Sequence, residues 1–340
     1  MTSLTAHLKA GKQILHDIPL ITQLSPLVWR FLGGNPGSYT LHGTNTYLIG
    51  TGDSRILFDA GEGDPSYSTT LRAGMQQAGC KYLSQIIVSH WHHDHLGGVP
   101  QVLALHLGQH GTNAVPVRKY MPSTDPKSFG TGESAIDPYT FFPKEKFIPI
   151  QHGETISDAG VHLRMLFTPG HANDHCVAVL QEENAMFTAD NVLGVGTSVF
   201  NDLHDYMHSL KVMLANAPGT LYPGHGPSIQ DGCGTIAAYI EHRLKRVVQA
   251  VEMLATTPTG ETAVLDWNLE TLTRAMYIDL DERLIPPAMG NTYQVLESLL
   301  KDGIVDRQGR GDPRRDGWKL IVPVDVAVTQ IKKNASSSKM

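Results

Sequence analysis

The histidines and aspartates of this chain gather where apolar, strand-like runs come to an end. The densest group, "SHWHHDHLGG" at residues 89–98, directly follows the run "QIIV". Three further stretches, "TPGH", "FTAD" and "YPGHG", place His171, Asp190 and His225 just after apolar runs. Residues at strand ends lie on loops held by a rigid scaffold, where binding groups are usually found. The fold must therefore carry one polar site on several strand ends.

The spacing within residues 89–98 suits metal ligands. His90 and His92 are two residues apart, so at an extended strand end they point the same way. Asp94 and His95 follow where the chain turns, and one short loop thus presents two pairs of ligands. Four ligands satisfy a single zinc ion, so the further residues downstream indicate a second ion. Imidazole with carboxylate suits zinc, and iron or manganese are chemically allowed.

Each histidine alone has a plainer explanation. A lone histidine is normally a core or surface residue, and we interpret His162, His204 and His242 in that way. "TPGH" or "YPGH" alone would favour the same explanation. The ordered occurrence of "HWHHDH", "TPGH", "FTAD" and "YPGH" makes chance a poor explanation for the set.

Short strands and helices alternate along the first two thirds of the chain. Alternation and turn residues predict strands at 45–50, 55–61, 84–90, 161–170, 175–183, 184–190 and 219–226. Helical spacing predicts helices at 64–79, 100–109, 202–217 and 236–255, with Thr235 capping the last.

We expect one large domain over residues 1–255 and a small module over 262–325. Residues 110–150, rich in Pro, Gly, Ser and Lys, are expected to form a long loop near the site. The small module has two helical segments followed by a turn-linked hairpin, an order typical of a winged helix. Four arginines make the hairpin tip basic: Arg307, Arg310, Arg314 and Arg315. The Ser-rich tail at 326–340 is expected to be disordered.

Composition limits the possible partners. A net charge of -6 argues against a broadly basic, nucleic-acid-coating surface, and no apolar run is long enough for a membrane span. Three cysteines without CxxC spacing indicate reduced thiols, and the first residues lack the pattern of a secretory signal. We therefore expect a cytoplasmic protein. The end Ser338-Lys339-Met340 differs in one residue from the S-K-L peroxisomal address, which leaves that address as an alternative.

With these motifs in place, the chain resembles the metallo-β-lactamase fold family through its H-x-H-x-D-H pattern. The resemblance covers roughly residues 28–325 and implies an α/β fold, an αββα sandwich with a winged-helix-like C-terminal module. The stretches "GTNTYLIG", "FDAGEGDPSY" and "FTADNVLG" resemble one lactamase-like subgroup. That subgroup contains fungal thioesterases that act on polyketides carried by an acyl carrier protein, such as the atrochrysone carboxyl type, and mitochondrial endoribonucleases.

The resemblance also implies a ligand set for two Zn2+ ions. One ion would be held by His90, His92 and His171, the other by Asp94, His95 and His225, with Asp190 bridging both. His93 falls at a variable position and is not carried over. Ala189 stands where many members have glycine, a change expected to leave Asp190 in place.

The expected chemistry is hydrolysis by a metal-bound hydroxide, because two close divalent ions lower the pKa of a shared water. Asp94 is the candidate catalytic residue, both a ligand and the group that orients the water. Gly97 and Gly98 would let the following helix approach closely. Substrate or supporting roles are suggested for four residues, each with a structural explanation as the alternative: Asn45, Asn173, Thr197 and Tyr206.

Fold does not fix the substrate. We favour a thioesterase that releases a polyketide or other small acyl chain from the acyl carrier protein domain of a polyketide synthase. One alternative is a zinc-dependent single-strand endoribonuclease, which would make RNA the partner and is suggested by the basic hairpin tip. Another is a glyoxalase-type thioesterase acting on small glutathione conjugates. A non-catalytic interaction protein is disfavoured, since every expected ligand is present.

Overall fold

The computed structural model describes residues 18–109, 114–123, 138–140, 142–256, 267–309, 311–312 and 315–336. The chain divides into two compact units, the first formed by residues 1–198 and 208–236 and the second by 199–207 and 237–340. Among the described residues, no helix has the length and apolar character needed to cross a membrane.

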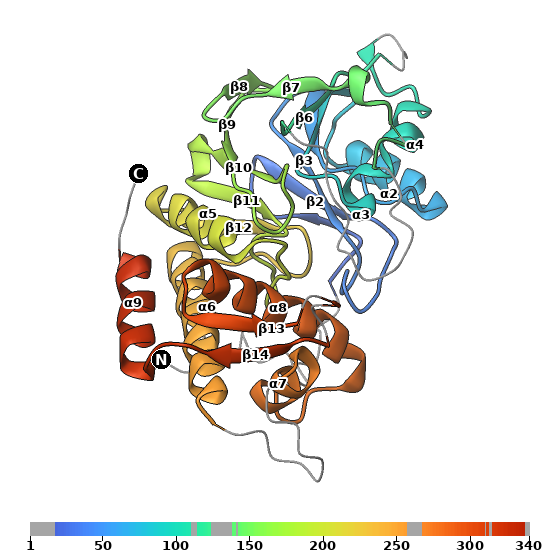
Figure 1. Cartoon of the computed structure of the whole chain (residues 1–340). Helices are drawn as coiled ribbons and strands as arrows, with labels where there is room; N and C mark the ends of the chain where they lie inside the picture. Colours follow the sequence, from blue (N-terminus) through green and yellow to red (C-terminus); the bar gives the residue numbers. More distant parts are fainter. Residues whose placement is uncertain are drawn as a thin grey trace. The chain divides into compact units, whose positions relative to one another are not determined.

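Two sheets form the centre of the first unit (Figure 1). The larger sheet has strands in chain order: β1 (Ile21–Gln23), β2 (Val28–Leu32), β3 (Asn45–Ile49), β4 (Ser54–Phe58), β5 (Tyr82–Val88), β6 (Val117–Tyr120) and β7 (Ile148–Ile150). The smaller sheet has the order β12 (Thr220–Pro223), β11 (Ala185–Ala189), β10 (Cys176–Leu180), β9 (Val161–Phe167) and β8 (Thr155–Asp158). The strands predicted from residues 45 to 226 are all confirmed, each within a few residues.

The α-helices described between residues 65 and 254 are α2 (Pro65–Gln77), α3 (His93–Leu96), α4 (Val99–Leu103), α5 (Leu203–Ala215) and α6 (Gly232–Leu254). Helix α2 begins as predicted, because Asp64 accepts a hydrogen bond from the Ser66 amide and Pro65 occupies the first turn. The predicted cap of α6 is wrong. Asp231, not Thr235, accepts the Gly234 amide at 2.9 Å.

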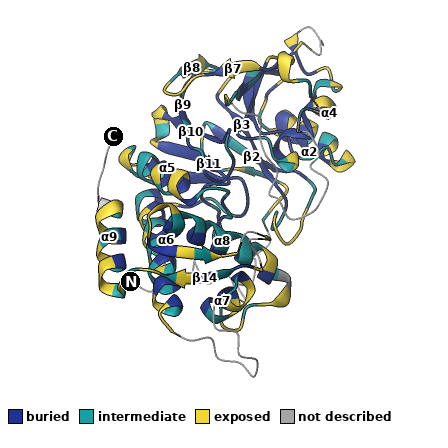
Figure 2. Cartoon of the chain, viewed as in Figure 1, coloured by how far each residue is buried: buried dark blue, intermediate teal, exposed yellow. Residues whose placement is uncertain are grey.

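Successive side chains of the larger sheet point alternately into two separate hydrophobic cores. Figure 2 shows strands of this sheet coloured as buried. On β4, Leu57 packs in a cluster with Tyr67 and Leu71 of α2. Its neighbour Phe58 points to the opposite face, where its ring lies 5.3 Å from that of Phe187 on β11. The second core therefore joins the two sheets face to face.

The far face of the smaller sheet is covered by α5. Arg164 of β9 hydrogen-bonds to Asn216, which follows α5, and Ser209 of α5 donates to the Pro169 carbonyl at 2.6 Å. The order helix, sheet, sheet, helix confirms the expected αββα sandwich.

Residues 110–150 are not one long loop. Two of their segments are the strands β6 and β7, paired in parallel with each other and, through β6, with β5. The hydropathy pattern does not predict β6, because its two buried positions are Val117 and Lys119 and a lysine is not expected in the core. Residues 110–113, 124–137 and 141 lie outside the described residues.

The second unit contains the expected pattern of a winged helix, with α7 (Leu269–Met276), α8 (Ile285–Lys301), β13 (Val305–Gln308) and β14 (Gly317–Leu320). The tail expected to be disordered from residue 326 is instead the helix α9 (Val324–Ser336). Its Ala327 and Ile331 are four apart and buried, so a short apolar stripe orders it despite its polar composition. Residues 337–340 lie outside the described part.

Gly98 confirms the expected close approach after the histidine loop and offers a test of it. An added Cβ would lie 2.0 Å from the Ala60 carbonyl oxygen, although the backbone there is ordinary αR. We predict that Gly98→Ala lowers the free energy of unfolding by about 1–3 kcal/mol. Gly219→Ala is the matched control, since its Cβ would lie 3.5 Å from the Asn184 oxygen. Equal urea midpoints for both variants would contradict the close packing.

Candidate metal centre

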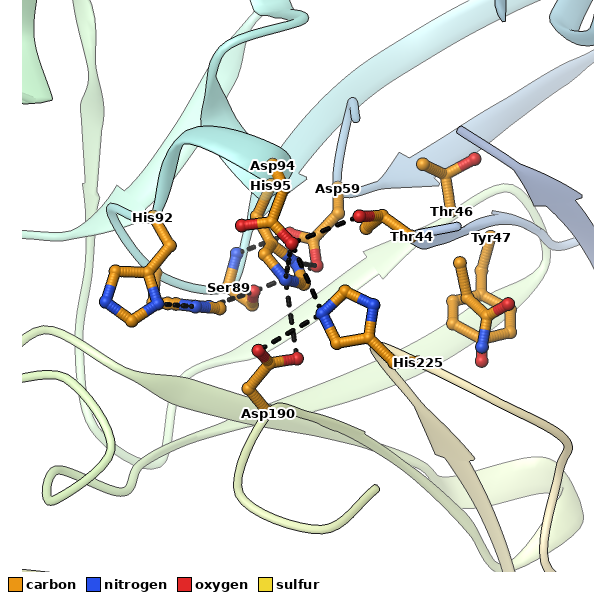
Figure 3. A network of polar contacts seen from close by, with 12 residues as sticks. Thr44, Thr46, Tyr47, Asp59, Ser89, His92, Asp94, His95, Asp190 and His225 are labelled. Carbon is orange, nitrogen blue, oxygen red and sulfur yellow. Dashed lines mark hydrogen bonds and ion pairs between the residues drawn. The ribbon is translucent and has the colours of Figure 1, made fainter. Parts of the chain in front are cut away.

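Seven side chains converge at one edge of the sandwich, and they are the seven named from the sequence. Their donor atoms form two groups, each with its members within 4.8 Å of one another. The His-rich group is His90, His92, His171 and Asp190, and the Asp94 group is Asp94, His95 and His225. Figure 3 shows most of these side chains pointing toward a common centre.

Each of the seven follows a strand, as the sequence pattern predicted. His90 and His92 follow β5, and the short helix α3 carries Asp94 and His95. The other three follow strands of the smaller sheet: His171 after β9, Asp190 after β11 and His225 after β12. The site therefore depends on the inter-sheet core, which sets the two sheets against each other.

The His-rich group has the geometry of ligands rather than of a hydrogen-bond network. His90 Nε2 and His171 Nε2 lie 3.0 and 2.9 Å from the same atom, His92 Nδ1. One ring nitrogen can serve only one such hydrogen bond well, because it carries either one proton or one lone pair. Three ring nitrogens facing one point fit a cation.

Asp190 lies between the two groups. Its Oδ2 is 3.6 Å from His171 Nε2 and 3.3 Å from His225 Nε2, and its Oδ1 is 3.4 Å from His95 Nε2. Among the described residues, the buried His95 Nε2 and Asp190 Oδ1 make no well-aligned hydrogen bond, only ion-pair contacts of 3.3–3.4 Å. Buried polar atoms normally have one, so these two atoms fit a bound ion as well.

Two histidines of the site differ in charge when no metal is bound. Burial and the neighbouring His171 lower the pKa of His92 to about 3. Burial acts on His225 in the same sense, but Asp190 and Asp94 outweigh it and raise the pKa of His225 to about 9. Burial would raise the pKa of Asp94, yet His95 and His225 hold it well below its usual range. Without metal, the His92 ring is therefore neutral, whereas His225 is protonated and paired with the carboxylates of Asp94 and Asp190.

Asp59 and Ser89 hold the ligands His95 and His90 in position through hydrogen bonds. Neither residue was predicted from the sequence. Asp59 Oδ2 lies 2.7 Å from His95 Nδ1 and accepts the Ser89 hydroxyl at 2.9 Å. Ser89 Oγ in turn lies 2.9 Å from His90 Nδ1. A carboxylate behind a ligating imidazole fixes its orientation and tautomer. The sequence feature that could have identified Asp59 is its position as an aspartate at the end of an apolar run, in "RILFDAG".

Asn45 supports the turn that carries His225. Its side-chain amide donates to the carbonyls of Pro223 and Gly226, both at 2.8 Å. Between them, Gly224 leaves room for the site, because a Cβ there would lie 2.2 Å from Asp190 Oδ1. Asn45 thus has a supporting position, one of the two roles suggested for it.

The other three residues suggested from the sequence are Asn173, Thr197 and Tyr206. Asn173 is half-buried in the turn after His171, and Thr197 is half-buried beside Ser198. The hydroxyl of the neighbouring Ser198 lies 3.3 Å from His171 Nδ1, and the role suggested for Thr197 stays a prediction. Tyr206 is fully buried with its ring 5.2 Å from that of Phe200 in the second unit, which gives it a packing position.

Two positions in the motifs behave as the resemblance implied. His93 is exposed and lies outside both donor groups. Ala189 has a φ of 42°, in the left-handed region that favours glycine, and Asp190 nevertheless reaches the site. This backbone conformation is one that glycine adopts more readily than alanine, in keeping with the glycine that the resemblance implies for many members.

A buried ion pair joins the loops of the His-rich group. Lys119 of β6 and Asp174, three residues after His171, are both fully buried and in direct contact. Asp174 Oδ1 also accepts the amide of Trp91, which lies between His90 and His92. The pair thus ties both histidine loops to β6.

We predict that the metal-stripped protein is most stable near pH 6.5, the ordinary pKa of histidine. As the pH falls from there toward 3, the unfolded chain binds protons that folded His92 does not, so stability falls. As the pH rises toward 9, folded His225 keeps a proton that the unfolded chain loses, so stability falls again. Urea midpoints across this range test the profile. His225→Asn should remove part of the alkaline fall, and an unchanged alkaline arm in this variant would contradict the assignment.

We predict that Lys119→Met costs about 3–5 kcal/mol of unfolding free energy, because it leaves the Asp174 charge buried without its partner. The double variant Lys119→Met/Asp174→Leu should recover most of that loss, since it buries no charge. Urea unfolding of both variants measures the difference. A double variant as unstable as the single one would show that the loss comes from packing instead.

Known families match both units. Residues 39–225 match the family model described as the metallo-beta-lactamase superfamily. Residues 269–318 match the beta-lactamase associated winged helix domain, which confirms the nature of the C-terminal module. One solved structure, a metallo-beta-lactamase family protein from Thermus thermophilus, aligns with a TM-score of 0.67 at 21% identity over 88% of this chain and 100% of its own.

Several relatives match along most of their length. The beta-lactamase-like protein 2 homolog of Drosophila melanogaster is 35% identical, covering 84% of this chain and 92% of that protein. Lactamase-like protein vrtG of Penicillium aethiopicum is 35% identical, covering 91% and 93%. Lactamase-like protein nscB of Aspergillus fumigatus is 36% identical, covering 93% and 90%. With its family match, its relatives and its convergent donor groups, the chain belongs to the metallo-beta-lactamase superfamily of hydrolases.

Proposed function

We propose that the protein is a dinuclear zinc hydrolase that releases an acyl chain, such as a polyketide, from an acyl carrier protein. The observation that supports it most is the position of Asp190 between two donor groups. Five imidazoles and two carboxylates in this arrangement fit divalent ions, with His90, His92 and His171 holding one and Asp94, His95 and His225 the other. Ions bound there would supply Lewis acidity and an acidified water.

Asp94 is the acid best placed to meet the substrate. Its side chain is 21% exposed, against 10% for Asp190 and 3% for His225. Since its pKa is held low, it is an ionised acceptor that can orient a water molecule by hydrogen bonding. In the reaction, water adds to the thioester carbonyl, the C–S bond breaks, and the proton that water loses ends on the leaving thiol.

The choice of a thioester rests on the stretches that resemble the subgroup and on the relatives named lactamase-like protein in two fungi. The basic hairpin supports the endoribonuclease alternative less than its four arginines suggested. Arg307 is paired with Asp316 at 2.6 Å and lies over the Trp318 ring at 6.0 Å, so its charge is neutralised. Of the other three arginines at this tip, only Arg315 lies in the described part of the chain.

We predict that zinc-loaded protein hydrolyses an acyl chain carried on an acyl carrier protein, and that Asp94→Asn lowers kcat by at least about 10²-fold. A thiol-reactive dye that follows the released pantetheine thiol measures the rate. His93→Gln is the matched control, because His93 stands next to Asp94 yet lies outside both donor groups. The same preparation is offered single-stranded RNA and a glutathione thioester. Cleavage of the RNA with intact acyl thioesters would overturn the proposal in favour of a ribonuclease, and exclusive cleavage of the glutathione thioester would favour a glyoxalase-type enzyme.

A further inference from the structure

A chain of hydrogen bonds leads away from Asp94 through residues with no role so far. The Thr44 hydroxyl lies 3.1 Å from Asp94 Oδ2, and Figure 3 shows this contact at the edge of the site. The side-chain amide of Asn35 donates to Thr44 Oγ1 at 3.1 Å and to Glu62 Oε2 at 3.0 Å. We call Thr44, Asn35 and Glu62 the Thr44 chain.

The direction of every hydrogen bond in the Thr44 chain is fixed by its ends. The Thr44 backbone N–H can only donate, so Asn35 Oδ1, 2.8 Å away, must be the acceptor. The amide nitrogen of Asn35 therefore faces Glu62 and Thr44 Oγ1, and both of its protons are used. Since Thr44 Oγ1 accepts from Asn35, its only proton goes to Asp94 Oδ2, which as a carboxylate oxygen can only accept.

The backbone around Asn35 is shaped for this arrangement. A Cβ on Gly33 or Gly43 would lie 3.1 or 3.2 Å from Asn35 Oδ1, so two glycines make room for the amide. Gly43 also has a φ of +113°, which other residues rarely adopt. Thr44 itself is fully buried, and its carbonyl accepts the Gly33 amide at 2.7 Å. The hydroxyl is thus held in place before any ion binds.

The hydrogen bond from Thr44 matters more for Asp94 than a similar one would for Asp190, the second carboxylate of the site. Its side chain is twice as exposed as that of Asp190, at 21% against 10%, so packing restrains it less. The oxygen that Thr44 contacts is the same Oδ2 that lies 3.3 Å from His95 Nε2 and 3.2 Å from His225 Nε2. Fixing this one oxygen fixes the geometry of the whole Asp94 group.

We propose that Thr44 is a positioning residue that presets Asp94 as a ligand, with Asn35 and Glu62 holding its hydroxyl in the donating orientation. The inference rests on the proposed metal centre and is independent of the thioester substrate. Groups behind metal ligands typically change metal affinity or activity by about 10–100-fold. Because Thr44 contacts Asp94, its loss weakens the ion at the Asp94 group and leaves the ion at the His-rich group bound.

The test is a zinc titration of the full chain against a chromophoric chelator, which resolves the affinities of two ions without any substrate. We expect Thr44→Val, which has nearly the same shape, to weaken one of the two ions by about 10–100-fold and to leave the other unchanged. Thr44→Ser keeps the hydroxyl and should bind both ions nearly as tightly as the wild type. In a His225→Asn background, Thr44→Val should have no further effect on the ion that remains.

Thr46→Val is the matched control. Thr46 is also fully buried, and its hydroxyl lies 3.2 Å from the Phe31 carbonyl and 2.6 Å from Tyr67 Oη. The Thr46→Val variant should have a lower free energy of unfolding than the wild type and the same affinity for each of the two zinc ions. Two affinities in Thr44→Val equal to those of the wild type, or the same loss in Thr46→Val, would overturn the positioning role alone. A wild-type chain that binds no zinc would instead overturn the metal centre, and this inference with it.

Discussion

Ring nitrogens that face one another away from water are unfavourable unless a proton or a metal cation lies between them. This constraint accounts for much of the architecture around the site. Lone pairs that converge at 2.9–3.0 Å on one ring nitrogen must be held there by the fold. The inter-sheet core, with Phe58 against Phe187, supplies the rigid frame on which the loops are mounted.

Each ligand loop has its own support, and the supports differ in kind. Asp59 and Ser89 act on the histidines after β5 through charge-assisted hydrogen bonds. Asn45 acts on the backbone of the His225 turn, and the Lys119–Asp174 pair acts on two loops at once. Because these supports come from different strands, no single loop determines the geometry of the site. This distribution suits catalysis, which depends on donors held in place before the substrate arrives.

Periodicity and composition predicted the parts of the fold where local and global preferences agree. The strands that end in ligands were predicted because apolar runs and polar ends alternate in the sequence. The strand β6 was missed because its core position is Lys119, whose partner Asp174 is distant in sequence and visible only after folding. The helix α9 was missed because composition outweighed a stripe of two buried residues, Ala327 and Ile331. Asp59 was missed for a related reason, since a supporting carboxylate has no motif spacing relative to the histidines.

Gly224 carries no functional group, yet its missing side chain is a condition of the site. Any Cβ there would occupy the space of Asp190 Oδ1. The absence of a side chain at Gly224 is therefore as much a requirement of the donor arrangement as the ligands themselves. A change of substrate is compatible with this centre only where it leaves the space beside Gly224 open, and loops away from the donors meet that condition.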